Sequence, residues 1–436
     1  MDYKKSKLET KSLSEEEESN DESITEEDLN NNVRRILDDL RVLFESSKIN
    51  LKFKTDLLKL SSILDNYSLK YFEDYDFSII FQIISENDNI DVLNISFNCI
   101  NNIISLSSST ECIRDSGFLE NIQRKIHNVS DYKINELFFK FLYKCSKGDL
   151  RDNIISTFNL KYIYDIIIKN NGIVSIYHIK YLKLFWDECM RDINAFKAIF
   201  DLINASNQKS DVIIITISVL QDFCLSIYDK EVTQSVISQI SKYFQSDNFQ
   251  IIAKVSEAIG TIAINGVFPE SFQMALIYDV LCSFPEQTTA KTFIWMCCVL
   301  CESECFVECL YKERIDELLL HRYQESSFFI KSCIIQVLAR TLTHACFPYM
   351  NHIIESNILG IICEHISANS SNEDSVIICL NSLANFLSIS IDIYEIIYYC
   401  IEKNISLERI ESLIDDTDPD VNAPAQIIIN FLKRNK

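Results

Sequence analysis

Glycine and proline are scarce in this sequence, with only 6 and 5 residues among 436. β-rich folds use both residues in their turns, and phosphate-binding loops need several glycines close together. The glycines here are too widely spaced for such a loop, at positions 117, 148, 172, 260, 266 and 360. We therefore expect neither a β-rich fold nor a nucleotide-binding loop.

Long apolar runs are also missing. The strongest short run is Val212 to Ile217, whereas a transmembrane helix needs about 18 or more apolar residues. Apolar residues nevertheless make up 47% of the chain and charged residues 24%. That balance is typical of a folded protein, so we predict a packed chain that does not insert into membranes.

The net charge is −22, from 41 basic and 63 acidic residues. Such a chain repels nucleic-acid phosphates, and no basic patch interrupts the acidity, so we expect no nucleic-acid partner. The N-terminus has no apolar core of a signal peptide, and the 16 cysteines are scattered through apolar helical pattern. We interpret them as reduced thiols of a protein in the cytoplasm or the nucleus.

Two regions differ in composition. Residues 1–25 are polar and acidic, and we predict a disordered tail because they cannot bury enough apolar surface to offset chain entropy. From residue 26 onwards apolar residues recur at spacings of three and four, beginning with Ile36, Leu40 and Leu43. This helical pattern persists to the C-terminus without a long linker, so residues 26–436 are predicted to form one helical domain.

A short helical motif repeats along that domain. A small or apolar residue precedes an aliphatic anchor, and another apolar residue follows three positions later, as in Cys99-Ile100-Asn101-Asn102-Ile103. The five clearest anchors are separated by 120, 39, 124 and 45 residues, which are multiples of about 40, and they are Ile100, Leu220, Ile259, Leu383 and Ile428. Weaker copies complete a series of ten and are centred on Leu60, Leu142, Leu182, Val299 and Leu338. An all-helical repeat of this length stacks into an α-solenoid, because one copy cannot bury its apolar face alone.

The segment 75–127 resembles an armadillo repeat in particular. A helix ends in the polar turn 86–89, a long helix follows from Asp91 to about Ser107, and a Ser-rich turn and a short helix then lead to Gly117. In armadillo repeats a glycine at that place permits the sharp turn between the first two helices, and Asn357 occupies a similar place later in the chain. The resemblance implies an all-α, right-handed α-solenoid of about ten armadillo-like (ARM/HEAT) helical repeats.

The armadillo resemblance also implies a binding site. The last helix of each armadillo repeat lines a concave groove, so residues two before and two after the anchors should project into it. These positions are rich in amides and include three lysines, and our predicted groove residues are Asn98, Asn102, Lys140, Lys144, Lys180, Asp222, Glu257, Gln336, Arg340, Asn381, Asn385 and Asn430. We predict a non-enzymatic scaffold that binds partner proteins or extended peptides through backbone hydrogen bonds. The lysines favour an acidic or phosphorylated ligand.

The layout is also similar to importin-α, with a charged N-terminal extension before about ten armadillo repeats. In that family Trp two before the anchor and Asn two after it line the groove. Asn102, Asn385 and Asn430 match the asparagine position, but no Trp occupies the other. The extension here is acidic, whereas the importin-β-binding segment of that family is strongly basic. A diverged adaptor for nuclear protein import is therefore the alternative function.

One cysteine cluster raises a different alternative, a zinc- or thiol-dependent enzyme using the region Cys297–Cys309. Cys298 and Cys301 form a C-x-x-C pair, and Cys297, Cys301, Cys305 and Cys309 are four apart. We expect those four to line one side of a continuous helix, on which they span roughly 18 Å, too far to share one zinc ion. We interpret them as small buried hydrophobes and predict no catalytic residue, no metal ligand and no cofactor.

The two tryptophans, Trp186 and Trp295, lie in apolar neighbourhoods. For both we favour core packing over a role as platforms for a bound peptide.

Overall fold

The structure is a computed structural model that describes residues 26–434, except for residues 116, 130, 186–199, 202, 204–207, 227–228, 270–273, 275–276, 278, 281–286, 345–346, 369–373 and 390–393. The tail predicted to be disordered, 1–25, lies outside the described residues. Across the described residues every regular element is a helix, which confirms the all-α fold class. The chain divides after Thr157 into two compact units, and each is described by itself.

All ten predicted anchors lie on helices, which we call the ladder helices. In the first unit these are α2 (Leu51–Asn66), α4 (Ile90–Ile103) and α7 (Tyr132–Cys145). In the second unit they are α10 (Ile176–Leu182), α13 (Ser210–Ser226), α15 (Phe249–Ile264), α17 (Gln287–Leu300), α20 (Phe328–Thr343), α23 (Asp374–Ile389) and α26 (Pro419–Arg434).

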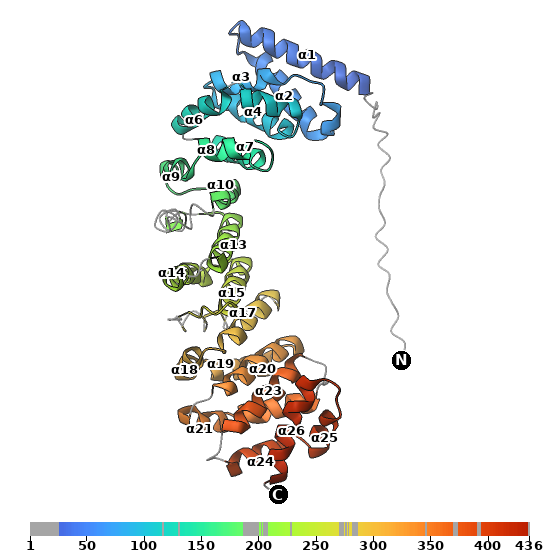
Figure 1. The fold of residues 1–436 in the computed structure, drawn as a ribbon, viewed down its shortest axis with the longest axis vertical. Helices are drawn as coiled ribbons and strands as arrows, with labels where there is room; N and C mark the ends of the chain where they lie inside the picture. The colour runs from blue at the N-terminus through green and yellow to red at the C-terminus, as the bar shows by residue number, and fades with distance from the viewer. Residues whose placement is uncertain are drawn as a thin grey trace. The chain divides into compact units, whose positions relative to one another are not determined.

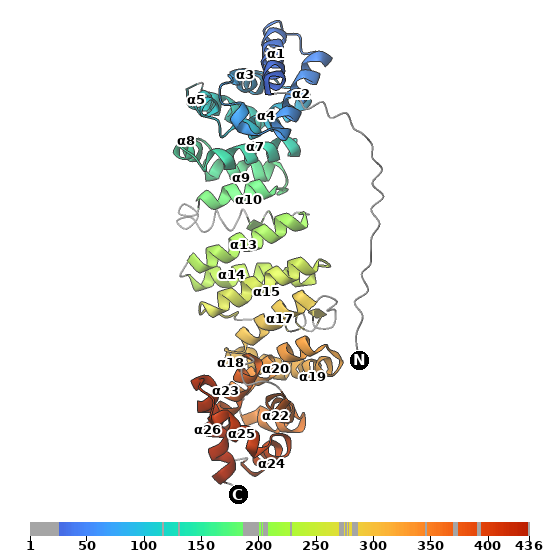
Figure 2. The same cartoon turned by 90° about the vertical axis from the view of Figure 1, so that its right-hand side faces the viewer.

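Within each unit, consecutive ladder helices pack directly against one another. Figure 1 shows this for α2, α4 and α7, and Figure 2 shows α13, α15 and α17 in successive layers. Nine of the ten anchors expose 1% of their surface or less, while Val299 is half-buried. The repeat read from the sequence is therefore a real packing unit, in which each ladder helix covers the apolar face of the next.

Outer helices precede the ladder helices. In the first unit they are α1 (Glu26–Glu45), η1 (Leu69–Tyr71), α3 (Ser78–Glu86), α5 (Ser107–Asp115), α6 (Phe118–Asn128) and α8 (Arg151–Thr157). In the second unit they are α9 (Leu160–Lys169), α14 (Lys230–Ser241), η3 (Lys242–Gln245), α18 (Glu304–Lys312), α19 (Ile315–Glu325), α21 (Phe347–Glu355), α22 (Ile358–Ala368), α24 (Tyr394–Asn404) and α25 (Leu407–Ile414). The short helix η2 (Lys183–Phe185) directly continues ladder helix α10.

Several repeats are triplets of two shorter helices and a ladder helix, as the armadillo resemblance implies. They are α5–α6–α7, α18–α19–α20, α21–α22–α23 and α24–α25–α26. Gly117 and Asn357 have φ of 61° and 62° at the turns between the first two helices of their triplets, which confirms the predicted left-handed turns. Arg314 takes the same conformation, with φ of 58°. Arginine gives no sequence signal for such a turn, so the sequence did not indicate the left-handed turn of the α18–α19–α20 triplet.

One helix boundary was predicted wrongly. The helix expected to reach Ser107 ends at Ile103, and the serines expected to form a turn begin α5. Serine favours the first turn of a helix as much as it favours loops, because its hydroxyl can accept hydrogen bonds from unpaired backbone N–H groups.

Asparagine begins many of these helices. The side chains of Asn50, Asn89, Asn159 and Asn248 accept hydrogen bonds from backbone N–H groups in the first turns of α2, α4, α9 and α15. Such caps satisfy donors that have no partner within the helix. They explain how the chain begins so many helices with little glycine or proline.

Candidate functional site

The predicted groove residues all lie on ladder helices, and none of them is buried. Their helices are α4 for Asn98 and Asn102, α7 for Lys140 and Lys144, α10 for Lys180, α13 for Asp222, α15 for Glu257, α20 for Gln336 and Arg340, α23 for Asn381 and Asn385, and α26 for Asn430. The buried anchors and these accessible neighbours therefore mark opposite sides of each ladder helix.

Several of these side chains join one ladder repeat to the next. The Arg340 guanidinium lies 2.7 Å from the Glu302 carboxylate, and Asp222 pairs with Lys183 at 2.5 Å. The Asn381 amide donates to the backbone oxygen of Asp420 at 3.1 Å. Exposed pairs of this kind contribute at most about 1 kcal/mol each, so these residues hold the surface seams between repeats as well as facing solvent.

Lys144 is also engaged within the protein. Its ammonium donates to the backbone oxygen of Asn101 on the preceding ladder helix. Burial, together with the neighbouring Lys140 charge, lowers the pKa of Lys144. In the second unit the Lys180 ammonium lies 5.5 Å from the centre of the Tyr177 ring. Lys144 and Lys180, two of the three predicted groove lysines, therefore have structural partners that the sequence did not indicate.

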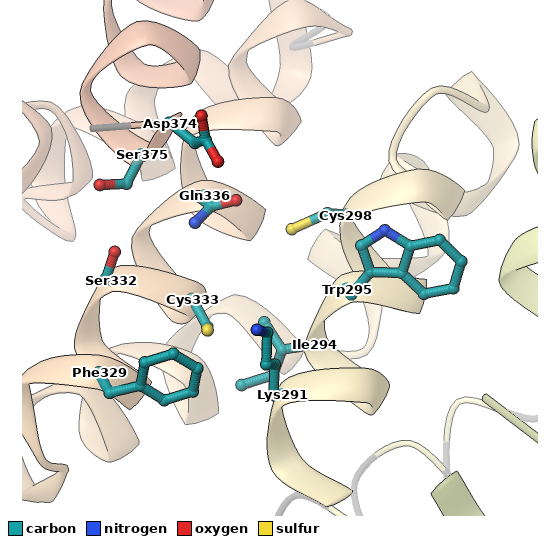
Figure 3. A pocket seen from close by; sticks show the side chains of 10 residues that line it. All are labelled: Lys291, Ile294, Trp295, Cys298, Phe329, Ser332, Cys333, Gln336, Asp374 and Ser375. Atoms are coloured by element: carbon teal, nitrogen blue, oxygen red, sulfur yellow. The ribbon is translucent and has the colours of Figure 1, made fainter. Parts of the chain in front are cut away.

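A surface cleft of 510 Å³ crosses three consecutive ladder helices of the second unit. Figure 3 shows the side chains that line it. They come from one stripe of α17, one stripe of α20 and the first turn of α23, and they are Lys291, Ile294, Trp295, Cys298, Phe329, Ser332, Cys333, Gln336, Asp374 and Ser375. The spacings of three and four residues place each stripe on one helix face. We call this site the α17–α20–α23 cleft.

Trp295 forms one wall of the cleft. The position where a Cβ atom of Gly260 on α15 would lie is 2.4 Å from the indole Cζ3, so the ring packs directly over the glycine. The remaining surface is partly accessible, since 37% of the Trp295 surface is exposed. Core packing was therefore the wrong prediction for Trp295, because more than a third of its surface is exposed. Trp186 lies outside the described residues.

The cleft has both apolar and polar lining residues. Ile294, Trp295 and Phe329 provide apolar surface, and the Lys291 ammonium lies 5.4 Å from the centre of the Phe329 ring. The Gln336 amide lies between Lys291 on α17 and Asp374 on α23 (Figure 3). A cleft with apolar walls and a few polar groups is the usual form of a binding site.

Two thiols line the cleft, and neither is activated. Burial raises the pKa of Cys298 well above its ordinary value, and burial also raises that of Cys333. A thiol is nucleophilic only as the thiolate, so both groups remain neutral at physiological pH. The arrangement is suited to binding.

Gln336 is the one predicted groove residue that lines this cleft. The rule of two positions before and after each anchor selects residues on the side of each helix opposite the anchor. The cleft is also lined by the face of α17 that is turned toward α20, which the rule does not select. Lys291 and Trp295 are eight and four residues before the anchor Val299. A search for exposed aromatics one helical turn from an anchor would have found Trp295.

The cysteine cluster is not on one continuous helix, so that prediction was wrong. α17 ends at Leu300 and α18 begins at Glu304. Ser303, in an extended conformation, precedes α18. Because of this break, Cys305 and Cys309 lie on a different helix from Cys297 and Cys298. Cys297, Cys298 and Cys301 are buried, as predicted for small hydrophobes, but Cys305 and Cys309 are exposed.

This division predicts a labelling pattern. A maleimide should modify Cys305 and Cys309 of the native protein at least tenfold faster than Cys297 and Cys301, because burial hinders access and raises the pKa of Cys297 to about 12. Peptide mass spectrometry after timed quenching measures each site. In denaturant the four rates should become similar. Rapid native labelling of Cys297 or Cys301 would contradict the packing described here.

Two further features bear on function. Among the described residues no three His, Cys, Asp or Glu side chains converge closely enough to hold a metal ion. No helix in the described part of the chain is long and apolar enough to cross a membrane.

Known proteins were compared with this chain by sequence and by structure. No protein family matches the sequence, and no curated protein matches it. The crystal structure of an engineered protein matches with a TM-score of 0.62 and 13% identity, covering 92% of this chain and 99% of that one. The chain has the fold of a helical repeat protein.

Two more distant matches were found. A designed armadillo repeat protein has a TM-score of 0.32 and 12% identity over 67% of this chain and 98% of its own. A second engineered protein has a TM-score of 0.31 and 12% identity over 63% and 96%. At these identities the similarity concerns the fold alone. The proposal for the function is therefore argued from the α17–α20–α23 cleft.

Proposed function

We propose that this protein is a non-enzymatic scaffold that binds an extended peptide segment of a partner protein along its ladder helices. The observation that carries the proposal is the α17–α20–α23 cleft, which crosses three successive repeats. Repeat proteins present long continuous surfaces of this kind to their ligands. An extended chain lying across the ladder helices would meet equivalent positions of successive repeats.

The polar groups of the cleft support a peptide ligand. Gln336 forms no hydrogen bond with any residue in the described part of the chain, and its amide can donate to and accept from a peptide backbone at the same time. Trp295 and Phe329 offer apolar surface beside it. Backbone hydrogen bonds with pockets for side chains are a common mode of peptide recognition.

The test is selection of a displayed random-peptide library on the immobilised full-length protein. Peptides enriched on the wild type should lose at least tenfold in affinity for Trp295→Ala, because the variant removes the largest apolar contact of the cleft. Tyr399→Ala is the matched control, since Tyr399 is an aromatic residue of α24, outside the cleft, with 68% exposure. Failure to enrich any peptide, or equal binding by the wild type and Trp295→Ala, would refute the proposal.

The same selection separates the finer alternatives. Acidic or phosphate-mimicking peptides whose enrichment is lost when Lys140 and Lys144 are replaced would support these predicted groove lysines as ligand-binding residues. Enrichment of lysine- and arginine-rich peptides would instead support the importin-α-like adaptor. Among the −2 positions of the ladder there is no tryptophan, and Trp295 lies at −4, so the scaffold remains our proposal.

A further inference from the structure

The α17–α20–α23 cleft carries charges of opposite sign on its two outer helices. Lys291 projects from α17, Asp374 begins α23, and the half-buried Gln336 of α20 lies between them (Figure 3). Both charged side chains belong to exposed residues. Among the described residues that line the cleft, Lys291 is the only cation, in a chain whose net charge is −22.

Within the described part of the chain neither Lys291 nor Asp374 forms an ion pair. Lys291 instead lies over the ring of Phe329, which keeps the ammonium at the apolar floor of the cleft. A ligand can therefore pair with each charge without displacing an internal partner.

The apolar surface of the cleft suits a ligand with an apolar side chain. Trp295 and Phe329 come from neighbouring helices, and Gln336 is two turns along α20 from Phe329. An apolar side chain that packs against these residues has the Gln336 amide on the same surface of the cleft. Successive side chains of an extended peptide point to opposite sides, so residues two before and two after an apolar anchor project from the same side as that anchor.

We infer that the cleft selects an extended peptide in which a bulky apolar residue lies between an acidic residue, which pairs with Lys291, and a basic residue, which pairs with Asp374. This inference rests on the proposed peptide-binding function. It adds the chemical class of the peptide.

The experiment repeats the peptide-library selection on three full-length proteins: wild type, Lys291→Glu and Asp374→Lys. Peptides that Trp295→Ala also enriches bind elsewhere and are subtracted. On the wild type, an apolar residue should be flanked by an acidic residue on one side and a basic residue on the other. On Lys291→Glu both flanking residues should become basic, and on Asp374→Lys both should become acidic. Exposed pairs are weak, so each charge mismatch should change the affinity of an individual peptide by about threefold.

The outcomes separate the two levels of the proposal. Peptides that require Trp295 but have the same flanking charges on all three proteins would overturn the charge selection and leave peptide binding intact. Absence of any Trp295-dependent peptide would overturn both. Both charge changes lie on exposed residues, and unchanged melting temperatures would show that the variants fold.

Discussion

Replacing His352 by leucine should lower the free energy of unfolding by about 3 kcal/mol at pH 7, because it leaves a buried carboxylate without its partner. Asp316, in the first turn of α19, is fully buried. Its Oδ2 lies 2.5 Å from Nε2 of His352 on α21. Chemical denaturation followed by circular dichroism measures the loss. His321→Leu is the matched control, since His321 is exposed and pairs with the exposed Glu325, and its loss should change stability by less than about 0.5 kcal/mol.

The pH dependence identifies the cause of this loss. Burial raises the pKa of Asp316 above its usual 3.8, and His352 opposes that rise. Without His352 the folded-state pKa of Asp316 rises further. At acid pH Asp316 is protonated in both the folded and the unfolded state, so no stability is lost to a buried charge. The loss grows as pH rises from about 4 through the folded-state pKa. Adding Asp316→Asn to His352→Leu should therefore restore stability at pH 7 and have little effect near pH 4. If the double variant is no more stable than His352→Leu at pH 7, the loss comes from packing and the electrostatic account is wrong.

Gly260→Ala should destabilise the wild-type protein by about 1 kcal/mol, although alanine is the better helix former by about 1 kcal/mol. The added Cβ would lie 2.4 Å from Cζ3 of the Trp295 ring, so the indole must move off α15. Overpacking of this kind costs about 1–3 kcal/mol. The emission of Trp295 should shift to longer wavelength as the ring becomes more exposed.

A double-mutant cycle tests the contact directly. In a Trp295→Ala background the overlap is gone, so Gly260→Ala should become stabilising by up to about 1 kcal/mol. The coupling energy between the two positions is then about 2 kcal/mol. Simple additivity would show that the ring does not rest on Gly260. Because Trp295 lines the α17–α20–α23 cleft, Gly260→Ala should also weaken any peptide that depends on Trp295.

The location of the candidate site shows how far sequence reasoning reaches. Reading two residues either side of each anchor placed Gln336 and Arg340 on the accessible side of α20, where both are found. The same rule could not show that Arg340 pairs with Glu302 while Gln336 stays available in the cleft. That distinction depends on which side chain of the neighbouring helix lies opposite. Two helices 39 residues apart in sequence meet there, and the sequence pattern within one helix carries no information about it.

The cysteine cluster shows a similar limit. Apolar periodicity predicted a continuous helix through Cys297–Cys309, because each cysteine fitted the expected face. The helix breaks after Leu300, and the tertiary packing of α18 then leaves Cys305 and Cys309 exposed. Periodicity reports which residues can share a face, whereas the choice between one helix and two depends on what the following segment packs against.

The amino-acid sequence alone determined that this protein is an array of about ten helical repeats, because the recurrence of buried aliphatic anchors is a one-dimensional signal. It also determined the left-handed turns at Gly117 and Asn357, where the residue type itself permits positive φ. Only the tertiary structure decided that Trp295 packs on Gly260 and stays partly exposed, and that Lys291, Gln336 and Asp374 share a cleft. Those relations join residues of different helices, and they follow from how neighbouring repeats pack, which no single helix encodes.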